Sequence, residues 1–160
     1  MVVVTPSRHT APMPVELSDA ISPAAATMRT QLLAVRRWAL AQGVPVDADV
    51  LALVLAAKSE LRGEPVTRWR RLDVYQHLWA DVRNWCSTHS TMVPENVPEI
   101  LWLYFSYLDE TDGFAEGSDP IRELRKPLRC YGGLGPDGLQ AKPGAPRPRC
   151  VCKVPYRRRG

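Results

Sequence analysis

The sequence predicts a single all-α bundle of four to five helices, followed by an irregular basic C-terminal segment. Apolar residues recur at helical spacing through the middle of the chain. Of the fifteen prolines, three lie within the first 14 residues and five follow Pro127. A length of 160 residues fits one domain that buries a core without disulfides. We therefore expect a flexible N-terminal arm (1–22), a helical domain (23–127) and a Gly/Pro-rich basic C-terminal segment (128–160).

The first helix is expected to begin at Pro23, with Ser22 as its N-cap. Proline suits the first helical position, where its missing N–H has no helical partner. The residues that recur at helical spacing are Met28, Leu32, Val35 and Ala39. Gly43 and Pro45 then end this helix.

A second helix is expected from Asp47 or Asp49 through VLALVLAAKSELR. Its surface is apolar on most sides, which predicts a central position in the bundle. The stretch from Gly63 to Pro65 breaks the chain again.

The third helix is expected over TRWRRLDVYQHLWADVRNWCSTH, with Thr67 as its N-cap. Its main apolar stripe is Trp69, Leu72, Tyr75, Trp79, Val82 and Cys86. A second stripe beside it is Val74, Leu78 and Trp85. Two stripes predict contact with more than one neighbouring helix. His77 falls away from the main stripe and is expected to be partly exposed.

A fourth helix should follow Asn96, which forms a pattern like a capping box with Glu99. It runs through PEILWLYFSYLDE, and the side chains expected to be buried are Ile100, Leu101, Tyr104 and Leu108. Asp119-Pro120 announces a short fifth helix, IRELRK, which should stop before Pro127.

The segment after Pro127 changes character. LRCYGGLGPDGLQ is rich in glycine and contains the turn signal PDG, and RCVCKVPY favours an extended conformation. These two pieces could pair as a short β-hairpin or lie against the helical body.

Charge is distributed unevenly along the chain. Residues 122–160 carry eleven Lys or Arg and two acids, a net of +9, on a chain whose total is +4. A basic segment on an acidic body is typical of proteins that contact nucleic acid or an acidic protein surface. The alternative is compositional, because 17 of the 21 basic residues are arginine, as a GC-rich coding sequence produces. The leading hypothesis is a non-enzymatic accessory or regulatory protein that binds through this segment.

The candidate contact residues lie at the start of the third helix and in the C-terminal segment. They are Arg68, Arg70, Arg71, Arg147, Arg149, Lys153, Arg157, Arg158 and Arg159. Positive side chains at a helix N-terminus oppose the helix dipole unless an anion binds there, which favours an anionic partner. The pattern supports non-specific electrostatic binding and gives no sequence-reading helix.

A zinc-stapled interaction module is the second hypothesis. The candidate ligands are Cys86, Cys130, Cys150 and Cys152, with His89 as an option because Cys86-Ser87-Thr88-His89 has a Cys-x-x-His spacing. The spacing departs from paired Cys-x-x-Cys ribbons. The alternative is that Cys86 is a buried apolar residue and the other cysteines are ordinary thiols. A structural zinc ion is the one cofactor that the sequence suggests.

A helical enzyme is the third hypothesis, although no nucleophile elbow, zincin motif or phosphate loop occurs. It requires a pocket in which several of Asp73, His77, Tyr104, Asp109 and Glu110 converge. The longest apolar run, residues 50–57, is too short to span a membrane, and the N-terminus lacks a secretory pattern. A cytoplasmic protein without a membrane partner is expected, and oligomeric state is left open.

Overall fold

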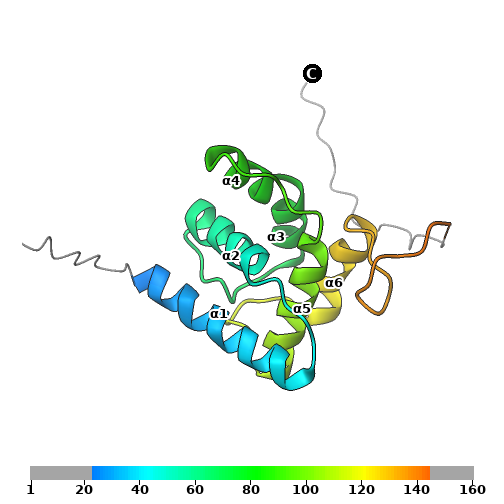
Figure 1. Ribbon diagram of the computed structural model, residues 1–160, viewed down its shortest axis with the longest axis horizontal. Helices are drawn as coiled ribbons and strands as arrows, with labels where there is room; N and C mark the ends of the chain where they lie inside the picture. The colour runs from blue at the N-terminus through cyan, green and yellow to red at the C-terminus, as the bar shows by residue number, and fades with distance from the viewer. Residues whose placement is uncertain (1–22, 145–160) are drawn as a thin grey trace, which may run out of the picture.

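The computed structural model describes residues 23–144, and they form an all-α fold (Figure 1). Five continuous helices run through this part of the chain, which contains no β-strand, so the all-α prediction is confirmed for it. Their bounds are α1 Pro23–Gln42, α2 Ala48–Arg62, a third helix divided into α3 Arg71–Gln76, the π-helical turn η1 His77–Asp81 and α4 Val82–Thr88, then α5 Val97–Glu110 and α6 Ile121–Cys130. The predicted N-terminal arm and the extended RCVCKVPY lie outside the described residues.

Helix α5 crosses the middle of the molecule in Figure 1 and supplies much of the core. It packs against α1, α2 and α6. The four side chains predicted to be buried in this helix, Ile100, Leu101, Tyr104 and Leu108, are all buried. Helix α1 lies at the edge of the bundle, where it contacts α2 and α5. One of its faces is therefore left open to solvent.

The ends of α2 follow the predicted signals. The backbone N–H of Val50 donates to Asp47 Oδ1 at 3.1 Å, and Gly63 ends the helix with φ of 61°. That left-handed conformation is one that glycine adopts without steric cost. Helix α5 also begins after Asn96 as expected, but the Asn96 side chain does not cap it. Its amide donates instead to Asp47 Oδ2 at 3.4 Å.

The third helix begins at Arg71, and the prediction of Thr67 as its N-cap is wrong. The backbone carbonyls of Thr67 and Trp69 accept hydrogen bonds from the N–H groups of Ala115 and Asp119. These bonds hold residues 67–70 as an irregular segment against the loop before α6. The Arg70 N–H donates to Asp73 Oδ2 at 3.1 Å, which satisfies one donor at the start of the helix.

The π-helical turn η1 changes which face of the third helix is buried. A π-turn closes its hydrogen bonds five residues apart, so it adds one residue and rotates the chain relative to a regular helix. As a result His77 is buried, and the prediction of an exposed His77 is wrong. Leu72 and Trp79, predicted in the main stripe, are 64% and 53% exposed, whereas Val82 and Cys86 are buried as expected. The predicted contact with two neighbours is confirmed, since this helix packs on α2 and α6.

Helix α6 continues through Pro127 to Cys130, so the predicted stop before that proline is wrong. Proline removes one helical hydrogen bond. Leu124 and Leu128 are fully buried on either side of it, and this packing holds the helix together across the defect. The Pro127 carbonyl accepts from the Tyr131 N–H at 2.9 Å at the end of the helix.

The chain after α6 folds back on the helices as far as Gln140, whose side-chain amide donates to Glu99 Oε1 at 2.7 Å. Leu134 is buried and forms an isolated antiparallel bridge with Gln140. The PDG stretch turns between them, and a Cβ at Gly138 would collide with the Trp102 ring. Any pairing with the extended segment beyond 144 lies outside the described residues. Among residues 23–144, no helix has the length and apolar character needed to cross a bilayer.

Candidate protein-interaction surface

The three arginines predicted at the start of the third helix differ in their surroundings. Arg68 Nε donates to the Glu116 carbonyl at 3.1 Å, and Arg71 pairs with Glu123 at 3.4 Å. Arg70 is exposed. The Arg71 N–H donates to the carboxylate of Asp119 at 2.8 Å. Side-chain carboxylates thus occupy the helix N-terminus where the sequence favoured an external anion.

The remaining arginines and the lysine of the predicted contact set lie outside the described residues. They are Arg147, Arg149, Lys153, Arg157, Arg158 and Arg159. Their role in binding stays a prediction.

The predicted zinc ligands within the described residues do not form a cluster. Cys86 lies in the hydrophobic core, and burial raises the pKa of its thiol, which disfavours the thiolate that binds zinc. His89 is exposed and stacks on Trp85 with ring centroids 3.8 Å apart. Residues 23–144 contain no group of three or more His, Cys, Asp or Glu arranged to hold a metal ion. A site that includes Cys150 and Cys152 lies beyond them and stays a prediction.

The residues required by the enzyme hypothesis have separate structural partners. The buried Tyr104 hydroxyl donates to the Val66 carbonyl at 3.0 Å, and Glu110 accepts from Trp38 Nε1 at 2.9 Å. His77 pairs with Asp81. Two surface pockets lie beside α1 and beside α4, and neither is lined by any of the five residues Asp73, His77, Tyr104, Asp109 and Glu110. The convergence that the enzyme hypothesis requires is therefore not found in either of these pockets.

A buried polar cluster between α2 and the third helix escaped the sequence analysis. Lys58 Nζ lies 3.6 Å from Glu64 and 4.2 Å from the centre of the Trp69 ring. Asp81 Oδ2 accepts from Arg62 Nε at 3.0 Å and lies 3.7 Å from His77 Nδ1. The η1 turn brings His77 and Asp81 onto this buried face.

Burial dominates the ionisation of the cluster. It lowers the pKa of Lys58 in spite of the opposing charges of Asp73 and Glu64, and it lowers the pKa of His77 in spite of Asp81. The pKa of Asp81 is also lowered, because hydrogen bonds from His77 and Arg62 outweigh its own burial. These side chains are packed inside the bundle, which is typical of a structural network.

We predict that Lys58→Met leaves the free energy of unfolding unchanged or raises it by about 1–2 kcal/mol at neutral pH. Methionine retains an unbranched apolar side chain against Trp69 and removes a buried charge. Glu64, which loses its partner, is partly exposed and stays hydrated. Urea unfolding monitored by circular dichroism measures the change, and a loss above about 2 kcal/mol would show that the ammonium contributes net stability.

The open face of α1 carries exposed apolar side chains on either side of an arginine pair. Leu33 is 54% exposed and Leu40 is 82% exposed. The two residues lie about two turns apart on the same face of α1. The groove they form, about 580 Å³, is called here the α1 groove. It is lined by Leu33, Arg36, Arg37, Ala39, Leu40, Val44, Pro45 and Val46.

Charge on this face has one sign. Helix α1 contains Arg29, Arg36 and Arg37 and no acidic residue, and the first acid after it is Asp47. Neither Arg36 nor Arg37 forms an ion pair within the described part of the chain. The sequence does contain a pattern that could have indicated this surface. A leucine lies on each side of an arginine pair, outside the buried stripe of a helix that has no acidic residue.

No family model, curated protein or solved structure matches this chain.

Proposed function

We propose that the protein is a non-enzymatic accessory protein that binds an acidic protein partner. The observation that supports this best is the α1 groove, in which two exposed leucines flank a pair of arginines without ion-pair partners among the described residues, on a helix without acids. Protein interfaces combine apolar contacts with polar groups, and arginine is enriched in them. The basic C-terminal segment would add a second electrostatic contact, as the sequence predicts.

The exposed leucines favour a protein over nucleic acid as the partner. Phosphates are held by cations and hydrogen-bond donors, and bases stack on aromatic rings or arginine. Leu33 and Leu40 provide neither kind of contact. Buried against apolar side chains of a partner, each would contribute about 1.5–3 kcal/mol. The arginine pair would then select a partner with an acidic rim.

A second copy of the chain fits this groove poorly. Two α1 faces brought together would place Arg36 and Arg37 of one copy beside those of the other, and like charges across an interface are unfavourable. The proposal therefore commits to a partner with the opposite charge.

The test is a fluorescence anisotropy titration of the full chain against a labelled amphipathic helical peptide with leucines on one face and glutamates on the other. We expect binding that weakens with salt and an Arg36→Glu/Arg37→Glu variant that binds at least about tenfold more weakly. Leu33→Ser/Leu40→Ser should also lose binding while its unfolding free energy stays within about 0.5 kcal/mol per site, because both side chains are exposed.

The matched control is Arg122→Glu/Lys142→Glu, which makes the same charge change at exposed positions away from α1. It should bind the glutamate peptide as the wild type does, and a lysine-for-glutamate peptide should not bind. Truncation after residue 144 measures the contribution of the C-terminal segment. Equal binding by both charge variants, or tighter binding to a duplex DNA or single-stranded RNA probe that persists in the Arg36/Arg37 variant, would overturn the proposal.

A further inference from the structure

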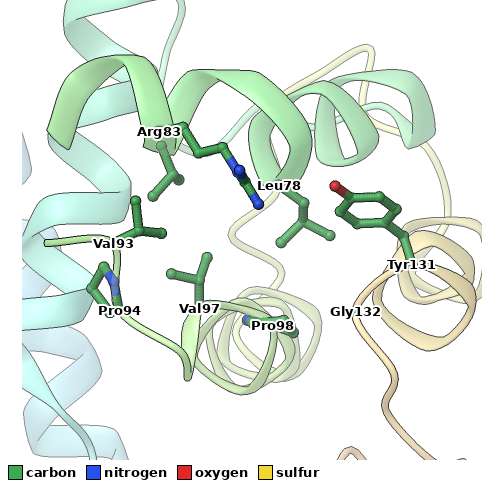
Figure 2. Close-up of a pocket in the computed structure, with 9 residues that line it drawn as sticks. Leu78, Arg83, Val93, Pro94, Val97, Pro98, Tyr131 and Gly132 are labelled. Carbon is green, nitrogen blue, oxygen red and sulfur yellow. The ribbon is translucent and has the colours of Figure 1, made fainter. Parts of the chain in front are cut away.

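A second hollow lies between α4, α5 and the end of α6, and it shares no residue with the α1 groove. Figure 2 shows its side chains gathered around one opening. Its volume is about 170 Å³. It is lined by Leu78, Val82, Arg83, Val93, Pro94, Val97, Pro98, Tyr131 and Gly132, and it is called here the Arg83 pocket.

Most of the residues that line the Arg83 pocket are apolar and suit a compact hydrocarbon body. Leu78 and Val82 come from the third helix, and Val93 and Val97 from the loop before α5 and its first residue. An engineered cavity of about 150 Å³ lined by apolar side chains is known to hold benzene. The Arg83 pocket is of similar volume and opens to solvent on one side.

Arg83 is the one charged side chain among the described residues that line the pocket. In Figure 2 the Arg83 side chain extends toward Leu78, and the Tyr131 ring lies on the other side of Leu78. Arg83 forms no ion pair or hydrogen bond with other residues of the described range, and no acidic residue lines the pocket. Arg83 is exposed to solvent, so its guanidinium is free to donate charge-assisted hydrogen bonds to an anion in the pocket.

We propose that the Arg83 pocket binds a small carboxylic acid with a compact apolar body. The carboxylate would accept hydrogen bonds from the Arg83 guanidinium, and the body would displace water from Leu78, Val82 and Val97. Ligand sites are typically concave and apolar with a few polar groups that fix orientation. A single arginine and no further cation suit one carboxylate better than a phosphate, which is usually held by several donors and charges.

Benzoate is the probe, added to the full ¹⁵N-labelled chain and followed by amide chemical shifts. We expect shifts at the residues of the Arg83 pocket and a dissociation constant on the order of 1 mM, which is ordinary for a ligand of this size. Benzamide, which has the same shape without the charge, should bind at least about tenfold more weakly. Arg83→Ala should weaken benzoate by about tenfold or more, the loss expected for one charge-assisted hydrogen bond.

Two variants separate charge from shape. Arg122→Ala removes an exposed arginine from α6 and should leave benzoate binding unchanged. Val93→Trp fills the pocket from a partly exposed loop position and should abolish binding by both probes without unfolding the chain. Equal affinity for benzoate and benzamide, equal affinity in Arg83→Ala, or shifts that fall outside the pocket would each overturn the proposal.

Discussion

Replacing Trp69 by alanine is expected to lower the free energy of unfolding by about 3–5 kcal/mol, the largest effect of any single change considered for this chain. Trp69 is fully buried at the junction of the irregular segment, α2 and α5. Its ring meets His77 and Phe105 edge-on at 5.3 and 5.2 Å between centroids. It also lies under the Lys58 ammonium. Alanine would leave a cavity there and remove one face of the pocket around a buried charge.

Urea unfolding at neutral pH measures this loss, with Trp79→Ala as the matched control. Trp79 is 53% exposed, so the same chemical change there should shift the unfolding free energy by less than about 1 kcal/mol. Trp69→Phe should fall between the two. Phenylalanine keeps the aromatic contacts but loses the indole hydrogen bond to the Val66 carbonyl, which still accepts from Tyr104. Similar losses for Trp69→Ala and Trp79→Ala would contradict the assignment of Trp69 to the core.

The contrast between these two tryptophans shows how far a periodic pattern can be read from the sequence. In α5 the backbone is regular from Val97 to Glu110, and the predicted buried side chains are buried. In the third helix the π-helical turn adds one residue to a turn, so the 3.6-residue period fails on either side of it. No residue of HLWAD marks that turn. It depends on packing against α2, which a single segment does not encode.

The predictions for Thr67 and Pro127 were wrong for the same reason, which is that contacts distant in the sequence override the local signal. Thr67 is a good N-cap residue, but its carbonyl is taken by Ala115 from a loop 48 positions away. Pro127 normally ends a helix, but Leu124 and Leu128 hold α6 across it through long-range burial. Local signals give the element and its type, and tertiary contacts decide where such an element begins or ends.

The candidate site was also predicted only in part, because local signals indicate a basic surface but tertiary packing decides which arginines are free. The sequence predicts a basic surface from composition, but the three arginines it favours in the helical domain include two with internal partners, Arg68 and Arg71. Arg36 and Arg37 carry the open surface because α1 lies at the edge of the bundle. Which helix is at the edge follows from the packing order of all five, and that order is absent from the local pattern.

Stability is expected to fall as the pH is lowered from 7 to 5, by up to about 2 kcal/mol, because of His77. Burial holds the pKa of His77 below its usual value of about 6.5, and the nearby Lys58 charge acts in the same direction. Below about pH 6.5, His77 therefore binds a proton in the unfolded chain but stays neutral in the folded chain. The free energy of unfolding then decreases by up to about 1.4 kcal/mol for each pH unit, until the folded protein is protonated as well.

The variant that tests this is His77→Gln, whose amide can still donate to Asp81 but does not titrate. Urea unfolding at pH 7, 6 and 5 should give a smaller decrease in this variant than in the wild type, and His89→Gln, an exposed histidine, should retain the wild-type decrease. Asp81 does not contribute to the change in unfolding free energy between pH 7 and pH 5. Its pKa is lowered by its hydrogen bonds, so the stability it contributes is present above about pH 4 and is lost only at lower pH. Equal decreases in His77→Gln and the wild type would mean that His77 ionises as freely in the bundle as in the unfolded chain, and the buried network would then have to admit water.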